Sequence, residues 1–351
     1  MKGTDVMIDF SSDYSQGAHA KVLEALVNTN GEHNTGYGLD VHCEKAADII
    51  RDLCKNDDLS VYMMVGGTPC NITVIAAALR PYQSVIALRT GHCYVHETGG
   101  VEATGHRVLT VEGVNGKINP DLIDKAFEEF EDEHTPEPGM VYISQPTECG
   151  SVYCKAELKA IFDKCRERGI FLYVDGARLG TALTCEGNDV TLEDLAHLCD
   201  AFYIGGTKNG ALFGEALVFS NHLMDDHFRF MMKRQCGMLA KGWLTGVQFE
   251  TLLSGGENSI YYEIARHENA LAKVIRDGLK SLDIEFYGDS PTNQVFPILP
   301  AEVVRELRKE FVFHDWSPER DGKMTVRFVT GFGTTREEAD RLVARIKELM
   351  G

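Results

Sequence analysis

The sequence contains no long apolar run. A membrane-spanning helix needs about 20 consecutive apolar residues, and no stretch of the chain approaches that length. The first residues, MKGTDVMIDFSSD, carry acids where a secretory signal peptide would need an apolar segment. We therefore expect a cytoplasmic protein that does not bind a membrane.

Paired cysteines are also absent. The ten cysteines are scattered along the chain, and none forms a CxxC pair or follows the spacing of a zinc site. In a chain of this size without an export signal, we expect them to be reduced and to behave as small apolar residues. The sequence predicts neither a disulfide framework nor a metal centre.

The sequence also lacks a surplus of positive charge. Lysine and arginine number 35 against 53 aspartates and glutamates, which gives a formal net charge of −18. An acidic surface repels phosphate backbones and anionic lipid headgroups. The charge balance therefore argues against nucleic acid as a partner, and by itself it suggests no other.

With 351 residues, the chain is long enough for one large core and a smaller second domain. Short β-rich apolar runs alternate with helical patterns, which is typical of an α/β fold with a mostly parallel sheet covered by helices. The expected strands are 60–65, 84–88, 107–111, 140–144, 171–174, 201–204 and 215–219. The last can be antiparallel, because only a short loop precedes it. The expected helices are 18–29, 41–55 and 156–168, with others starting near Asn71 and Pro120.

The pattern changes after about residue 245. One long helical run, 246–283, is followed by the short β-rich segments EFYG, QVFPIL and TVRFVTG. A closing helix is expected from Thr335 to Met350, because Thr335 and Glu338 have the spacing of a capping box. Residues 246–351 are therefore predicted to form a smaller α+β C-terminal domain.

Two segments place reactive side chains at one edge of the predicted sheet. YVDGAR (173–178) and GGTKNG (205–210) each follow a buried strand, and open α/β sheets bind ligands at the carboxyl ends of their strands. Asp175 and Lys208 should therefore reach the same crevice. A lysine that can form a Schiff base and a carboxylate that can pair with a pyridinium nitrogen are what pyridoxal 5'-phosphate chemistry requires.

Two further strand ends add candidate residues. In VGGTPCN (65–71), glycine amides, a helix start and the Thr68 hydroxyl suit phosphate binding, although the segment also fits a purely structural turn. In GHCYVHETGG (91–100), His92 and His96 are four residues apart, which suits a metal pair or simply a polar helix start. In a pyridoxal enzyme an aromatic or histidine ring commonly stacks on the cofactor, and His92 lies nearer the strand end.

Two arginines are candidates for binding a substrate carboxylate, because a guanidinium group binds a carboxylate bidentately. Arg178 follows Asp175 on the same turn, where a surface salt bridge is the alternative. Arg327 lies in TVRFVTG between apolar neighbours, where an unpaired charge is costly. A buried acidic partner would satisfy Arg327 as well as a substrate would.

Taken in order, these motifs resemble the threonine aldolase branch of the fold-type I pyridoxal phosphate enzymes, which is grouped with the β-eliminating lyases. The resemblance covers essentially the whole chain and rests on DFSSD, YG, GGTPCN, GHCYVHETGG, PTECG, YVDGAR, TKNG and TVRFVTG. It implies the transferase-like fold of that class. It also implies an N-terminal segment (1–20) that contributes to the active site and the small domain, and a large cofactor-binding domain (21–245).

The resemblance implies roles for individual residues. Those that bind pyridoxal 5'-phosphate would be Lys208 as the Schiff-base lysine, Asp175 at the pyridine nitrogen, His92 on the ring, and Gly67, Thr68 and Thr207 at the phosphate. Those that contact the substrate would be Ser12, Arg178 and Arg327 at its carboxylate, with His96 close by. Tyr37 and Lys241 would reach the site of a neighbouring subunit in a homodimer or homotetramer.

The implied reaction is the aldol cleavage of a small β-hydroxy amino acid, threonine or allo-threonine, to glycine and acetaldehyde. The same cofactor also supports β-elimination, decarboxylation or amino transfer, and a non-catalytic pyridoxal-binding protein is a further alternative.

Two positions depart from the family pattern: Glu148 in PTECG replaces a histidine, and Ser11 replaces a frequent arginine. The base for the substrate hydroxyl therefore stays open among Glu148, His92, His96 and an ordered water.

Overall fold

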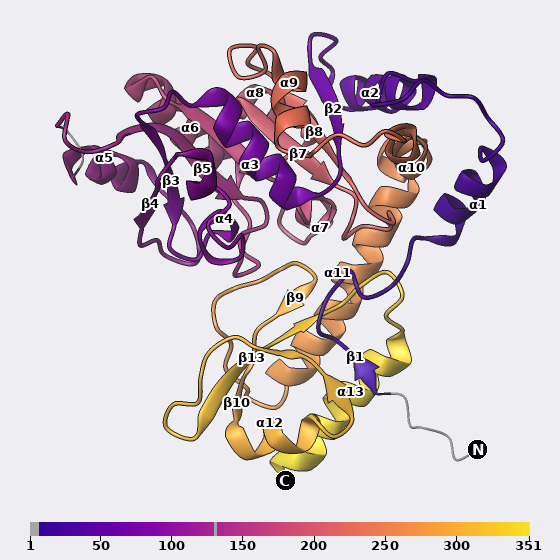
Figure 1. The fold of residues 1–351 in the computed structure, drawn as a ribbon. Helices are drawn as coiled ribbons and strands as arrows, with labels where there is room; N and C mark the ends of the chain where they lie inside the picture. Colours follow the sequence, from indigo (N-terminus) through magenta and orange to yellow (C-terminus); the bar gives the residue numbers. More distant parts are fainter. Residues whose placement is uncertain (1–6, 130–131) are drawn as a thin grey trace.

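The computed structural model describes residues 7–129 and 132–351, and its largest element is a seven-stranded sheet (Figure 1). The strands lie in the order β2-β8-β7-β6-β5-β3-β4. They are β2 (Ser60–Met64), β3 (Gln83–Leu88), β4 (Val108–Val111), β5 (Glu137–Ser144), β6 (Phe171–Asp175), β7 (Ala201–Gly205) and β8 (Glu215–Phe219). Neighbouring strands are parallel except at β8, which is antiparallel to both β2 and β7. The predicted sheet and its antiparallel last strand are confirmed.

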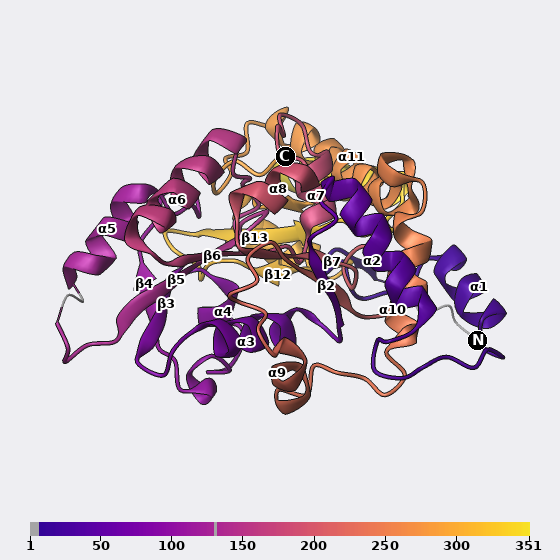
Figure 2. The same ribbon diagram turned by 90° about the horizontal axis from the view of Figure 1, so that it is seen from above.

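Helices cover both faces of this sheet (Figure 2). One face carries α2 (Val41–Cys54), α5 (Pro120–Glu129), α6 (Lys155–Arg168), α7 (Leu179–Thr184) and α8 (Leu192–Leu198), and the other carries α3 (Gly67–Ala78), α4 (His92–Val95) and α9 (Phe228–Arg234). Side chains alternate along a strand, so β6 packs into both cores: Leu172 and Val174 on the first face, Tyr173 on the second. This double burial explains the continuous apolar runs in the sequence.

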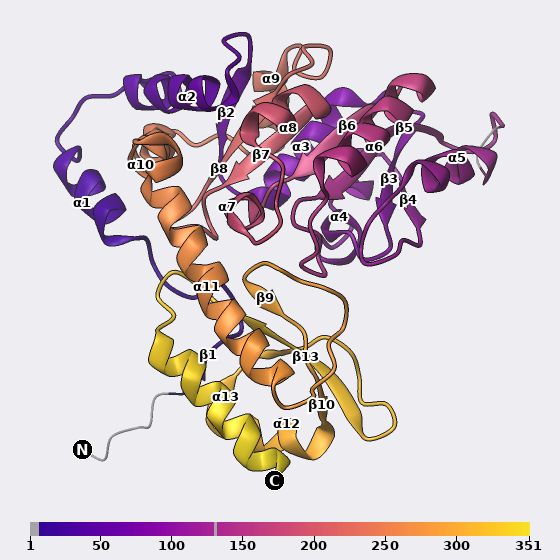
Figure 3. The same cartoon turned by 180° about the vertical axis from the view of Figure 1, so that it is seen from behind.

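The C-terminal part forms a smaller sheet packed on helices (Figure 3). Its central strand, β13 (Lys323–Val329), is antiparallel to β9 (Gln294–Val295), β10 (Ile298–Pro300) and β12 (His314–Asp315). The helices are α11 (Ile260–Lys280), α12 (Ala301–Leu307) and α13 (Arg336–Met350). Thr335 caps α13 through the predicted capping box with Glu338. Among the helices of the described ranges, none has the length and apolar character that crossing a membrane would require.

The N-terminal segment packs into this C-terminal part. β1 (Ile8–Asp9) pairs in parallel with β11 (Phe311–Val312). Phe10 is fully buried, with ring centroids 6.3 Å from Phe311 and 6.2 Å from Phe328. The chain then continues to α1 (Ala20–Asn28), which packs against α10 (Trp243–Leu253). The boundaries at residues 20 and 245 stay predictions, and residues 1–6 lie outside the described part of the chain.

The single helix expected over 246–283 is wrong. The structure has two helices, α10 and α11, separated by a short 3-10 turn over Gly256–Asn258. Gly255 and Gly256 have φ values of +101° and +64°, a conformation that glycine adopts at little cost and that ends an α-helix. Residues 254–259 (SGGENS) contain no apolar side chain and include two adjacent glycines, a turn signal that the expectation of one helix did not take into account.

Two smaller expectations also need correction. Helix α3 begins at Gly67 and not near Asn71, so the glycine-rich segment is itself the first turn of the helix. The segment EFYG makes only an isolated bridge, between Phe286 and Pro297. Two backbone hydrogen bonds flank this bridge, from Tyr287 to Phe296 at 2.9 Å and from Ile298 to Glu285 at 2.8 Å.

The N-terminal anchor leads to a stability prediction. Replacing Phe10 by alanine should lower the free energy of unfolding by about 3–5 kcal/mol, because a fully buried ring leaves a cavity between Phe311 and Phe328. Urea unfolding followed by circular dichroism measures the change. In the control, Leu223→Ala at a side chain that is 79% exposed, the change should stay within about 0.5 kcal/mol. Equal losses in the two variants would contradict this packing account.

Candidate active site

A cavity of about 320 Å³ lies at the carboxyl ends of β2, β6 and β7. The predicted site residues that line it are Gly67, Thr68, His92, Glu148, Asp175, Arg178, Thr207 and Lys208. They come from five separate segments of the chain. The parallel strands end at one edge and so bring these segments together, as expected for an open α/β sheet.

Asp175 is the last residue of β6, and its carboxylate is buried among hydrogen-bond donors. The hydroxyls of Tyr142 and Tyr203 donate to it at 2.5 Å each, Asn71 Nδ2 donates at 3.0 Å, and the amide of Ala177 donates at 3.0 Å. Burial works to raise the pKa of Asp175, but the positive charge of His92 and the tyrosine hydroxyls hold it below its usual value. The group is therefore an ionised acceptor in a fixed orientation.

His92 begins α4 and is linked to Asp175 through two buried side chains. Its Nδ1 lies 2.8 Å from Glu97 Oε1, and Asn71 Nδ2 donates to the same Glu97 oxygen at 2.7 Å. Burial alone would lower the pKa of His92, but the hydrogen bond with Glu97 and the charges of Asp175 and Glu148 raise it above its usual value. The ring is thus held at the cavity wall by its Nδ1 edge.

Lys208 lies in the turn after β7, and its side chain lines the cavity. Burial, and then the positive charge of Arg178, lower the pKa of Lys208 below its usual value. The ammonium group lies 5.8 Å from the ring centroid of Tyr14. A lysine with a lowered pKa offers more of the neutral amine, which is the nucleophilic form.

The first turn of α3 forms one wall of the cavity. Val65, Gly66, Gly67 and Thr68 line it, so N-terminal amides of a twelve-residue helix face the space. A Cβ on Gly67 would lie 2.9 Å from the Tyr203 hydroxyl, so only glycine fits here without a shift. Such a wall suits an anionic group of a ligand.

The two predicted carboxylate-binding arginines differ in their partners. Arg178 is already paired with buried Asp13, through Nε at 2.6 Å and a terminal nitrogen at 3.1 Å. Asn293 also donates to Asp13, at 2.9 Å. Arg327 on β13 has a buried Nε without a hydrogen-bond partner among the described residues. Burial, and then the charge of Arg178, lower the pKa of Arg327.

The other predicted site residues lie outside this cavity. Ser12 lines a neighbouring cavity with Asp13. His96 is exposed, with its ring centroid 5.4 Å from that of His92. Tyr37 and Lys241 are both exposed, and their loops touch where the Tyr37 amide donates to Ala240 at 3.1 Å. Their predicted roles are not tested by one chain.

Sequence reasoning missed several groups in the cavity wall or directly behind it. Asn71 and Glu97 stand inside motifs already singled out, but their mutual hydrogen bond joins residues 26 positions apart. Tyr142 and Tyr203 look like ordinary strand residues in apolar runs. Glu215, a buried acid at the start of β8, was detectable as the one charged residue in EALVF.

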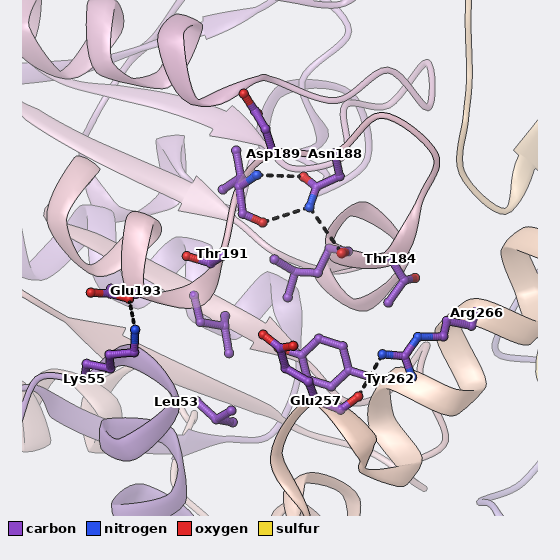
Figure 4. Close-up of a pocket in the computed structure, with 13 residues that line it drawn as sticks. Leu53, Lys55, Thr184, Asn188, Asp189, Thr191, Glu193, Glu257, Tyr262 and Arg266 are labelled. Carbon is purple, nitrogen blue, oxygen red and sulfur yellow. Dashed lines mark hydrogen bonds and ion pairs between the residues drawn. The ribbon is translucent and has the colours of Figure 1, made fainter.

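A second cavity, of about 330 Å³, lies away from these strand ends (Figure 4). Its basic side chains are engaged with the protein: Lys55 pairs with Glu193 at 2.6 Å, and Arg266 donates to the Glu257 carbonyl at 2.8 Å. Within residues 7–129 and 132–351, no three His, Cys, Asp or Glu side chains are arranged to hold a metal ion. The metal-pair alternative for the two histidines therefore has no geometric support.

Comparisons with known proteins cover nearly the whole chain. The low specificity L-threonine aldolases of a Pseudomonas species and of Pseudomonas aeruginosa are 30% and 28% identical, each alignment covering 99% of both proteins. A solved structure of Leishmania major threonine aldolase is 40% identical, with a TM-score of 0.96 over 98% of this chain and 100% of that one.

More distant structures share the fold alone. A mutant Thermus thermophilus aspartate aminotransferase is 17% identical, with a TM-score of 0.72 over 99% of this chain and 92% of that one. The fold is that of the fold-type I pyridoxal phosphate enzymes. The model of the beta-eliminating lyase family matches residues 9–301. The chain therefore belongs to the beta-eliminating lyase family.

Proposed function

We propose that this chain is a pyridoxal 5'-phosphate-dependent aldehyde-lyase that cleaves β-hydroxy-α-amino acids, converting threonine or allo-threonine to glycine and acetaldehyde. The observation that carries the proposal is one cavity that holds both Lys208, with its lowered pKa, and ionised Asp175. The full-length relatives named threonine aldolase support the choice of reaction.

The residues around the cavity fit this cofactor. Lys208 would bind its aldehyde carbon, Asp175 its pyridine nitrogen and His92 its ring, while Gly67, Thr68 and Thr207 would bind its phosphate. The volume of about 320 Å³ is within the usual range for small-molecule sites. When bound, the cofactor supplies an electron sink for the bond that breaks at the substrate α-carbon.

The arginines would orient the substrate. Arg327 has a buried donor without a partner, so its guanidinium would bind the substrate carboxylate, with Arg178 and Ser12 beside it. Asp13 holds Arg178 bidentately, which fixes the plane of that guanidinium. Holding the carboxylate fixes the torsion of the Cα–Cβ bond, and such positioning lowers the barrier.

Glu148 would take the proton from the substrate hydroxyl. Its side chain lines the cavity, and the Ser144 hydroxyl donates to Oε1 at 3.2 Å. The Oε2 atom remains as the proton acceptor. His92 is the weaker candidate base, because its raised pKa leaves less of the neutral ring, which is the form that accepts a proton.

The oligomer and the location are part of the same proposal. Tyr37 and Lys241 are exposed and adjacent but do not line this chain's cavity, so they would complete the site of a second copy in a homodimer or homotetramer. The protein would act in the cytoplasm.

The reaction is tested by the products. Purified protein with pyridoxal 5'-phosphate and threonine or allo-threonine should release glycine and acetaldehyde in equal amounts. Lys208→Ala should abolish both this release and the visible absorbance of the bound cofactor, while the exposed control Lys280→Ala retains them. Pyruvate with ammonia, carbon dioxide, or amino transfer to a keto acid would instead identify a β-eliminating lyase, a decarboxylase or an aminotransferase. Bound cofactor without any product would identify a non-catalytic protein.

The role of Arg327 is tested by steady-state kinetics. Arg327→Ala should raise KM for threonine about 10- to 100-fold, because a charged hydrogen bond contributes about 1.5–3 kcal/mol and 1.4 kcal/mol is tenfold. The absorbance of the bound cofactor should not change. An unchanged KM would show that the substrate carboxylate binds elsewhere.

The role of Glu148 is tested by an isosteric change. Glu148→Gln should lower kcat roughly 10²- to 10⁴-fold, the usual contribution of a general base, with little effect on KM or on cofactor absorbance. The exposed control Glu302→Gln should behave like the parent protein. If Glu148→Gln stays active while His92→Asn loses turnover, the base is His92.

A further inference from the structure

Glu215 is a buried acid at the same strand edge that the mechanism above does not use. It is the first residue of β8, which is antiparallel, so it lies beside the carboxyl ends of the two flanking strands. Its register partners are Met64 on β2 and Gly205 on β7. The side chain is 4% exposed and lines the cavity.

The contacts of Glu215 are neutral donors. The Gly206 amide donates to Oε2 at 2.8 Å, and Thr207 also hydrogen-bonds to the carboxyl. No lysine, arginine or histidine of the described residues forms an ion pair with it. Burial raises the pKa of Glu215 to about 7, although those hydrogen bonds act to lower it.

Groups from each neighbouring element act on this acid. The charged ones are Lys208, in the turn after β7, which lowers the pKa of Glu215, and Asp175, on β6, which raises it. The remaining ones are Cys70 on α3, Tyr203 on β7 and Tyr261 on α11. Burial raises the pKa of each of these three well above its usual value, so they stay neutral near pH 7.

The position of Glu215 matters for the phosphate. The proposed phosphate-binding residues Gly67, Thr68 and Thr207 line the same cavity, and Thr207 hydrogen-bonds to Glu215. An ionised carboxylate here would repel a phosphate dianion strongly, because the site is poorly solvated. A neutral carboxylic acid would instead donate a hydrogen bond. Resting on the proposed function, we infer that Glu215 binds the cofactor phosphate as a neutral carboxylic acid, so that cofactor binding takes up a proton.

The pH dependence follows from the sign of this linkage. Below about pH 7 the acid is already protonated, and phosphate binding is at full strength. Above that pH the proton must be supplied on binding, so affinity falls roughly tenfold for each pH unit. The phosphate and the pyridine nitrogen of the ligand also exchange protons on binding. Comparison with a variant that differs only at Glu215 subtracts their contribution to the proton uptake.

The test uses the full chain freed of cofactor and titrated with pyridoxamine 5'-phosphate, which lacks the aldehyde that Lys208 would bind. Calorimetry at about pH 8 in buffers of different ionisation enthalpy counts the protons taken up. The parent protein should take up about one proton more than Glu215→Gln, which keeps a neutral donor but cannot titrate. Glu268→Gln, at another buried acid whose pKa is raised by burial and which does not line the cavity, should retain the extra uptake.

Pyridoxamine without phosphate is the second control, and the difference between the parent protein and Glu215→Gln should vanish with it. Equal proton uptake by these two proteins with the phosphorylated ligand would overturn the inference and leave the proposed function standing. The same extra uptake with both ligands would also overturn it, because the proton would not belong to the phosphate. If the phosphorylated ligand does not bind at all, the proposed function fails together with the inference. Thermal melting of each variant without ligand confirms that the proteins compared are folded.

Discussion

Burying the carboxylate of Asp175 at the end of β6 costs several kcal/mol of hydration unless other donors replace the lost water. Tyr142 from β5, Tyr203 from β7 and Asn71 from α3 supply those donors, so three elements are fixed around one charge. The Tyr203 hydroxyl in turn leaves room only for glycine at position 67. The positions of Asp175, of its two tyrosine donors and of Gly67 therefore depend on one another.

The positive groups are arranged by the same electrostatic logic. Arg178 is paired with Asp13. Burial, and then the positive charge of Arg178, lower the pKa of Lys208. Arg327 is left with a buried donor that lacks a partner. Asp13 also binds Asn293, so the N-terminal segment joins the large sheet to the smaller one. Lys208, whose pKa is lowered, and Arg327, whose buried Nε has no partner among the described residues, are therefore the basic groups left for a ligand.

The sequence predicts the sheet and the lysine–acid pair well, because buried parallel strands give continuous apolar runs and Asp175 and Lys208 directly follow two of them. It predicts poorly whatever depends on distant partners. Arg178 and Asp13 are 165 positions apart, and neither motif shows that the two pair. The break between α10 and α11, in contrast, is visible in the sequence, because SGGENS (254–259) has two adjacent glycines and no apolar residue. Glu215 is visible as the one charged residue of EALVF, but its burial in the cavity wall depends on neighbours that are distant in the sequence.

The central claim is that one cavity binds pyridoxal 5'-phosphate through Lys208. Reduction of the holoenzyme with borohydride, followed by peptide mapping, tests it most directly, because reduction makes a lysine–cofactor linkage permanent. The account predicts a single modified residue, Lys208, in the peptide that contains GGTKNG. Modification of a different lysine, or cofactor that is bound but leaves every lysine unmodified, would contradict it.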